Sequence, residues 1–108
     1  KRNPSWPTHL FVLNDLAAIQ LIGLLGKRGI RVPEDLSITG FDDLPTVRHW
    51  TPSLTPLCVP RKEMARAAAR LLLDILADRP GSSGILQSFP IRLVERESCA
   101  PPRQTAIR

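Results

Sequence analysis

The sequence predicts an α/β fold in which helices flank a parallel sheet. Short apolar runs rich in strand-forming residues, at 9–13 and 36–41, enclose an apolar segment of helical length at 16–28. A strand, a helix and a second strand joined by short links form a right-handed parallel unit. A second segment of helical periodicity, at 61–78, lies between two further extended runs. This alternation is typical of an α/β domain.

The first predicted strand, residues 9–13, ends at Asn14. Asp15 is a good N-cap for the helix predicted over 16–28, and Gly29 is a natural stop after it. The helix is apolar over most of its surface, so we expect other elements to cover it on more than one side.

The second predicted strand, 36–41, leads into a loop at 44–53 that prolines interrupt. The third extended run, 54–59, contains Pro56, which has no N–H for a ladder. We therefore expect this strand to lie at an edge of the sheet or at a bend. A final strand is predicted over 86–95, interrupted at Pro90.

The second helix is predicted to begin after Pro60 and to run to about residue 78. Its apolar stripe comprises Met64, Ala68, Leu71, Leu72, Ile75 and Leu76. Both helices need apolar partners that the predicted elements do not supply. We therefore expect residues 1–100 to be an incomplete domain of a longer protein and residues 101–108 to be a frayed tail. We also expect the isolated chain to be marginally stable or to self-associate through this stripe.

The charge pattern predicts a solvated surface rather than a nucleic-acid interface. The chain has 15 Lys and Arg against 10 Asp and Glu, a formal charge of +5, but no block of like charge. No element offers a recognition helix to DNA. Cys58 and Cys99 have neither a metal-binding nor a C-x-x-C spacing, which favours reduced thiols in the cytoplasm. No apolar run is long enough to cross a membrane.

No catalytic constellation is present in the sequence. There is no nucleophile elbow and no P-loop, and the spacing of Gly23, Gly26 and Gly29 is not that of a dinucleotide-binding turn. His9 and His49 have no neighbouring Cys or His, so we expect no metal and no cofactor. An enzyme of the doubly wound class is therefore the least favoured alternative.

A ligand site is predicted where two strands end. Asn14 follows the first strand and Asp42 the second, and ligands bind beyond the carboxyl ends of parallel strands. An amide beside a carboxylate suits a polyhydroxylated or amine-bearing ligand. The alternative is that both residues simply form turns, which Asn and Asp favour. Asp43 is either a loop acid or a cap.

Four segments, in order, resemble the LacI/GalR (lactose-repressor/galactose-repressor) family of bacterial transcription regulators. The resemblance covers nearly the whole chain from Pro7. It rests on Pro7 to Ala18 with its Asn14-Asp15 pair, Gly29 to Asp43 ending in Gly40-Phe41-Asp42-Asp43, Leu54 to Leu57 followed by Pro60 and Glu63-Met64, and Arg96 to Pro102.

The resemblance implies a sensor of the periplasmic-binding-protein type (type I), of which this chain is the C-terminal portion. In the family a small-molecule effector, often a sugar, binds between two lobes and changes the affinity of a homodimer for operator DNA. DNA is read by an N-terminal helix-turn-helix that this chain lacks. The resemblance makes Asn14 and Asp42 effector-binding residues. It places Ile19 and Trp50 on the dimer face.

The sequence departs from the family pattern at three positions. Leu13 stands where a small residue is common, and Val59 where a polar residue, often Gln, is usual. Arg61 replaces an apolar or aromatic residue that often lines the cleft. It either binds an anionic effector, such as a phosphorylated sugar or a carboxylate, or is a surface arginine.

The alternative to a regulator is the secreted sugar-binding protein of a transporter, which shares the two-lobed fold. Two segments favour the regulator: Gly40-Phe41-Asp42-Asp43 and the ending Arg96-Glu97-Ser98. A signal peptide in the full gene, in place of a helix-turn-helix, would reverse this choice.

Overall fold

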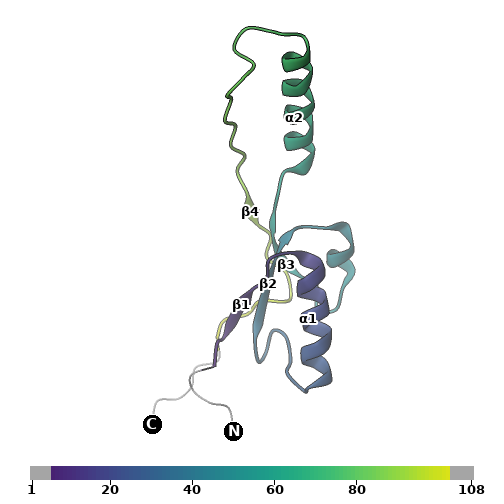
Figure 1. Cartoon of the computed structure of the whole chain (residues 1–108). Coiled ribbons are helices and arrows are strands. Elements are labelled where there is room, and N and C mark those ends of the chain that lie inside the picture. Colours follow the sequence, from purple (N-terminus) through teal and green to yellow (C-terminus); the bar gives the residue numbers. More distant parts are fainter. Residues whose placement is uncertain (1–5, 103–108) are drawn as a thin grey trace. The chain divides into compact units, whose positions relative to one another are not determined.

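The computed structural model of the chain describes residues 6–102 (Figure 1). Most of the predicted tail, 101–108, therefore lies outside the described residues. The elements in order are β1 (His9–Phe11), α1 (Asp15–Lys27), β2 (Ser37–Asp42), the 3-10 turn η1 (Pro45–His49), β3 (Thr55–Cys58), α2 (Arg61–Leu76) and β4 (Arg92–Leu93). They divide into two compact units. Val59–Ile91 form the second unit and the rest of the chain forms the first.

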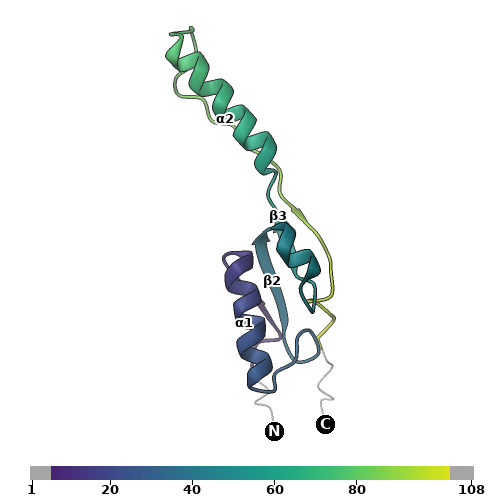
Figure 2. The same cartoon turned by 90° about the vertical axis from the view of Figure 1, so that its right-hand side faces the viewer.

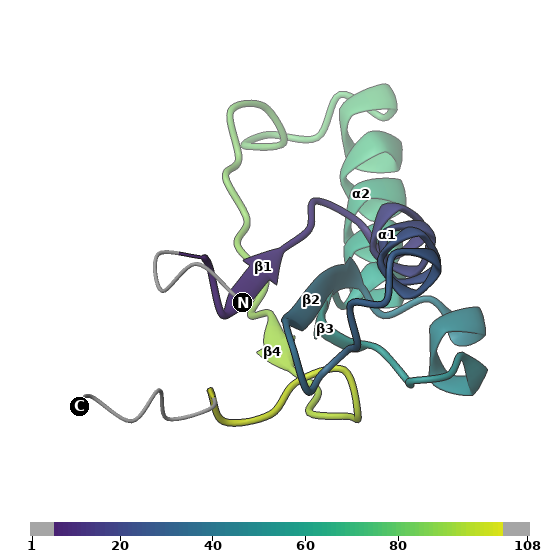
Figure 3. The ribbon, with the colours of Figure 1, turned by 90° about the horizontal axis from the view of Figure 1, so that it is seen from below.

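The first unit is built on a four-stranded sheet in the order β1-β2-β3-β4. Figure 3 views the strands from below, with α1 to one side of them. β1 pairs with β2, and β2 with β3, in parallel, whereas β4 is antiparallel to β3. The register aligns Phe11 with Thr39 and Thr39 with Thr55. The predicted α/β class with a parallel sheet is therefore confirmed.

Two predictions about the strands were wrong. The strand expected over 86–95 is only Arg92–Leu93, because its partner β3 ends at Cys58 and leaves the earlier residues without a strand to pair with. Pro56 does not put β3 at an edge, since β2 and β4 lie on either side. The carbonyl of Pro56 still accepts a hydrogen bond from the Val94 N–H at 3.0 Å, although its own nitrogen can donate none in return.

The core of the first unit lies on one face of the sheet, beneath α1 and η1 (Figure 2). The buried apolar side chains are Ala18, Ile22, Leu36, Ile38, Val47 and Leu54. α1 begins one residue earlier than predicted and ends before Gly29, whose φ of +73° suits glycine. On the other face of the sheet Phe11 is half exposed and meets Phe41 edge to face.

The second unit consists of α2 and the segment that follows it. α2 ends at Leu76 rather than at residue 78, and Ala77 caps it by donating to the Leu73 carbonyl. An ion pair of 2.7 Å joins Asp74 to Arg79 beyond the helix end. None of the helix residues is buried, and Leu72, Leu73 and Leu76 are each more than half exposed. The apolar side chains predicted for this helix are thus uncovered within its own unit.

Candidate functional site at the carboxyl ends of the strands

Asn14 and Asp42 lie at the same edge of the sheet, as the sequence predicts. The Val12 N–H donates to the Thr39 carbonyl at 2.8 Å, so the parallel pairing of β1 with β2 extends one residue beyond the end of β1. Asn14 follows two residues after Val12, and Asp42 three residues after Thr39. Asp42 is also aligned with Cys58, so β3 ends at the same level. Three strands thus end together at this edge.

Asn14, not Asp15, caps α1. The Asn14 backbone is extended, and its Oδ1 accepts a hydrogen bond of 2.9 Å from the Ala17 N–H. Within residues 6–102 its amide nitrogen has no hydrogen-bond partner. The cap fixes the orientation of the side chain and leaves its donor available to a ligand.

Asp42 combines a strained backbone with a half-buried side chain. Its φ is +113°, a conformation that side chains other than glycine rarely adopt and that costs about 1–3 kcal/mol. The residue is half-buried, and its carboxylate makes no hydrogen bond or ion pair with the part of the chain that the structure describes. Strained residues of this kind concentrate at functional sites.

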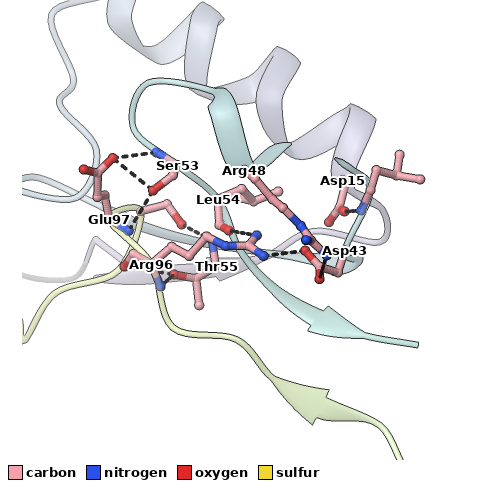
Figure 4. Close-up of polar contacts among 10 residues, drawn as sticks. Asp15, Asp43, Arg48, Ser53, Leu54, Thr55, Arg96 and Glu97 are labelled. Carbon is pink, nitrogen blue, oxygen red and sulfur yellow. Dashed lines mark hydrogen bonds and ion pairs between the residues drawn. The ribbon is translucent and has the colours of Figure 1, made fainter. Parts of the chain in front are cut away.

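Asp43 differs from its neighbour, since its buried carboxylate forms ion pairs with two arginines (Figure 4). Its Oδ1 accepts from Arg96 Nη2 at 2.6 Å and its Oδ2 from Arg48 Nη2 at 2.9 Å. Burial alone would raise the pKa of Asp43, but the hydrogen bonds and charges of the two arginines outweigh it and hold the pKa below its ordinary value. Asp43 is therefore ionised and is held within the chain by the two arginines.

Asp15 is completely buried behind this edge of the sheet (Figure 4). Its Oδ2 accepts a hydrogen bond of 2.7 Å from the Leu44 N–H, while its Oδ1 has no hydrogen-bond partner among the described residues. A Cβ on Gly40 would collide with this Oδ1 and with Leu54 Cδ2. Burial, assisted by the charges of Asp42 and Asp43, raises the pKa of Asp15.

The segment after β4 closes the sheet at its other end. Ser98 lies where β2 and β3 begin: its Oγ accepts from the Thr55 N–H at 2.8 Å and donates to the Ile38 carbonyl at 2.6 Å. Glu97 accepts hydrogen bonds from the backbone and the hydroxyl of Ser53, which lower the pKa of its carboxyl group. The segment Arg96-Glu97-Ser98, which resembles the family motif, therefore links β2 to β3 through hydrogen bonds.

Val59 and Arg61, the other two predicted site residues, belong to the second unit. Val59 is half-buried, and its carbonyl accepts from the Arg61 N–H at 2.8 Å. Arg61 is the exposed first residue of α2. Their roles remain predictions.

The predicted dimer contacts lie on the side of the first unit formed by α1 and the loop after η1. Trp50 is 43% exposed at an open groove of about 800 Å³, whereas Ile19 is half-buried against the core. Gly23 and Gly26 line the groove, and nothing lies within 4 Å of the place where their Cβ atoms would be. The other lining residues include Ile22, Gly29, Val32 and Pro52.

Sequence reasoning missed the roles of Asp15 and Arg96 and left that of Asp43 open. Asp15 was assigned as a cap, and Arg96 appeared only within the closing segment. The segment Arg96-Glu97-Ser98 was the available signal, because it contains the partner of Asp43 53 positions away. Within residues 6–102 no helix is long and apolar enough to cross a membrane.

Comparison with known proteins identifies the family. A model of the periplasmic binding protein-like domain matches residues 1–99. The chain therefore belongs to this family of domains, and the resemblance to LacI/GalR-type regulators is confirmed within it. The HTH-type transcriptional repressor PurR of Vibrio cholerae (strain M66-2) is 33% identical over 92 residues, which are 85% of this chain and 27% of the repressor.

Solved structures agree with this assignment. A LacI family transcriptional regulator from Enterococcus faecium with bound ribose is 35% identical with a TM-score of 0.78, over 87% of this chain and 35% of that one. A regulator from Arthrobacter sp. FB24 in complex with lactose is 34% identical with a TM-score of 0.75, over 86% and 36%. The chain spans about a quarter of the length of the curated relatives it matches.

Proposed function

We propose that the chain is the effector-sensing and dimerising part of a LacI-type transcription regulator, acting as a repressor in the cytoplasm. In this proposal a sugar-like small molecule binds at the carboxyl ends of the strands and shifts the protein between conformations of different operator affinity. The likeness to regulators with bound ribose and lactose supports the sugar class. Operator DNA would be read by a domain outside these residues.

The proposal depends most on the environment of the Asp42 carboxylate. This half-buried carboxylate has no partner among residues 6–102, so it loses hydration and gains nothing in return unless a ligand supplies hydrogen-bond donors. Sugar hydroxyls are such donors. The free amide nitrogen of Asn14 at the same edge could donate to a ligand oxygen, so that the two side chains match the two hydrogen-bonding roles of a hydroxyl.

A binding experiment with Asp42→Asn tests the site. Asn keeps the shape of the side chain, but it removes the charge and replaces one acceptor oxygen with a donor NH2 group. Titration calorimetry with D-ribose and with lactose should show at least a tenfold loss of affinity for the sugar that binds, because a hydrogen bond to a charged group contributes about 1.5–3 kcal/mol. The matched control is Asp74→Asn in α2, whose ion pair is exposed. Equal affinity in both variants would reject Asp42 as a ligand.

Dimerisation is the second part of the proposal, and the groove at Trp50 supports it. Two helical glycines with open space around them cost helix stability without improving packing inside the chain. A second copy that approaches α1 closely would explain both the glycines and the exposed tryptophan. Sedimentation of Trp50→Ala should show a weaker dimer, while Trp6→Ala, an exposed tryptophan that does not line the groove, should not. An unchanged dimer in Trp50→Ala would exclude this face.

The secreted binding protein of a transporter remains the second candidate, because the fold alone does not distinguish the two. The curated relative named above is a transcriptional repressor, which favours regulation. Translation of the coding sequence upstream of Lys1 decides the question. A helix-turn-helix about one sensor lobe before Lys1 supports the regulator, and a signal peptide supports transport.

A further inference from the structure

The strained conformation of Asp42 needs an external support. Its own carboxylate bonds to nothing among residues 6–102, so the side chain cannot hold its φ of +113°. The next two residues are held firmly. The Asp43 carboxylate is fixed by Arg96 and Arg48, and the Leu44 N–H is fixed by Asp15. Asp42 is the last residue of β2 and is aligned with Cys58 on one side, and these contacts hold the backbone that follows it on the other.

The two buried anchors belong to different elements. Arg96 is only 14% exposed, and besides Asp43 it binds the Leu54 carbonyl through Nη1 at 2.8 Å (Figure 4). Its backbone N–H also donates to Thr55 Oγ1 at 2.9 Å, which joins it to β3. Asp15 lies in the first turn of α1, next in sequence to Asn14. The anchors thus connect β3 and α1 to the backbone directly after Asp42.

We infer that Asp15, Asp43 and Arg96 are positioning residues that hold Asp42 in its strained conformation beside Asn14, and so set effector affinity without contacting the effector. The inference rests on the proposed function for its ligand. The arrangement itself can be tested without one. A merely structural role would affect stability alone, whereas a positioning role couples the network to the backbone of Asp42.

A double-mutant cycle in the 108-residue chain measures this coupling. Glycine adopts a positive φ without strain, so Asp42→Gly should lower the unfolding equilibrium constant in urea by about fivefold while the network holds the backbone. In an Arg96→Met background the strain is released, and the same change should alter the constant less than twofold. Equal gains in both backgrounds would overturn the inference.

Two further variants keep the cycle informative. Arg79→Met breaks the exposed ion pair with Asp74 in the second unit, away from the groove at Trp50, and should leave the fivefold gain from Asp42→Gly intact. Arg96→Lys retains the charge but not the planar fork that reaches Asp43 and Leu54 together, so an intermediate gain is expected if Arg96→Met does not fold. A full gain in Arg96→Lys would again count against the network.

The ligand arm uses D-ribose and lactose in titration calorimetry. Arg96→Lys should weaken the binding of whichever sugar binds by about tenfold at unchanged stoichiometry, and Arg79→Met should leave that affinity unchanged. Unchanged affinity in Arg96→Lys would overturn the effect on binding. If neither sugar binds the unsubstituted chain, the sugar class in the proposed function fails, and the double-mutant cycle alone decides whether the network holds Asp42.

Discussion

Replacement of Gly40 by alanine tests the close approach of α1 to β2. The backbone of Gly40 does not have a positive φ, so alanine fits its conformation, and only the added methyl group matters. That methyl group would collide with Asp15 Oδ1 and would lie 2.7 Å from Leu54 Cδ2. Both side chains are fully buried, so neither can move into solvent.

The expected cost follows from two effects. Overpacking of a filled core costs about 1–3 kcal/mol. If the Asp15 carboxylate is displaced, the Leu44 N–H loses its acceptor, which adds about 1–3 kcal/mol. We therefore expect Gly40→Ala to lower the free energy of unfolding by about 3 kcal/mol. For a domain of this size that corresponds to a fall in Tm of about 12–20 °C.

Thermal unfolding followed by circular dichroism measures the effect, with Gln20→Ala as the control in α1. Gln20 is exposed and does not line the groove at Trp50, so alanine there should change stability by less than about 0.5 kcal/mol. The double variant Gly40→Ala with Leu54→Val should lose less than the sum of the two single changes, because valine removes one of the colliding atoms. A Tm for Gly40→Ala within 2 °C of the parent would refute the packing argument.

The remaining predictions concern pH and the closing segment. The pKa of Asp43 is lowered on folding, so its stabilising contribution is present above its unfolded pKa and is lost as the pH falls through its folded pKa. Urea unfolding of Asp43→Asn should therefore show a smaller loss of stability at acid pH than the parent. The pKa of Asp15 is raised on folding, so its stabilising contribution is present below its unfolded pKa and is lost as the pH rises through its folded pKa. Asp15→Asn should remove that loss. If the stability–pH profiles of Asp43→Asn and Asp15→Asn run parallel to that of the parent, both pKa assignments are contradicted. Ser98→Ala leaves the buried Thr55 N–H without its acceptor and should cost about 2 kcal/mol in chemical unfolding. The exposed control Ser82→Ala should change stability by less than about 0.5 kcal/mol, and equal losses would contradict the role of Ser98.

Local patterns predicted the elements better than their ends. The strand at residues 9–13 was found at His9–Phe11, and the helix at 16–28 was displaced by one residue because Asn14 provides the cap. The prediction for residues 86–95 failed for a non-local reason. An apolar run becomes a strand only where a partner strand is present, and β3 ends at Cys58.

The candidate site shows the same division. Strand order and the residues that follow each strand placed Asn14 and Asp42 together, since parallel neighbours end at one edge. The sequence assigned Asp42 to the ligand site but left Asp43 as either a loop acid or a cap, because nothing near it in the chain identifies its partner. Their difference depends on Arg96, which is distant in sequence and meets only one of them.

The sequence alone determined the α/β class, the positions of both helices and the family, because periodicity and short motifs are properties of neighbouring residues. Only the tertiary structure decided that Asp43, not Asp42, forms the ion pairs, why Gly40 must be small and which strands the closing segment at 96–98 joins. These depend on contacts such as those of Ser98 with Ile38 and Thr55, which join parts of the chain 60 and 43 positions apart. Burial and partners define the role of a polar residue, and both exist only after the chain has folded.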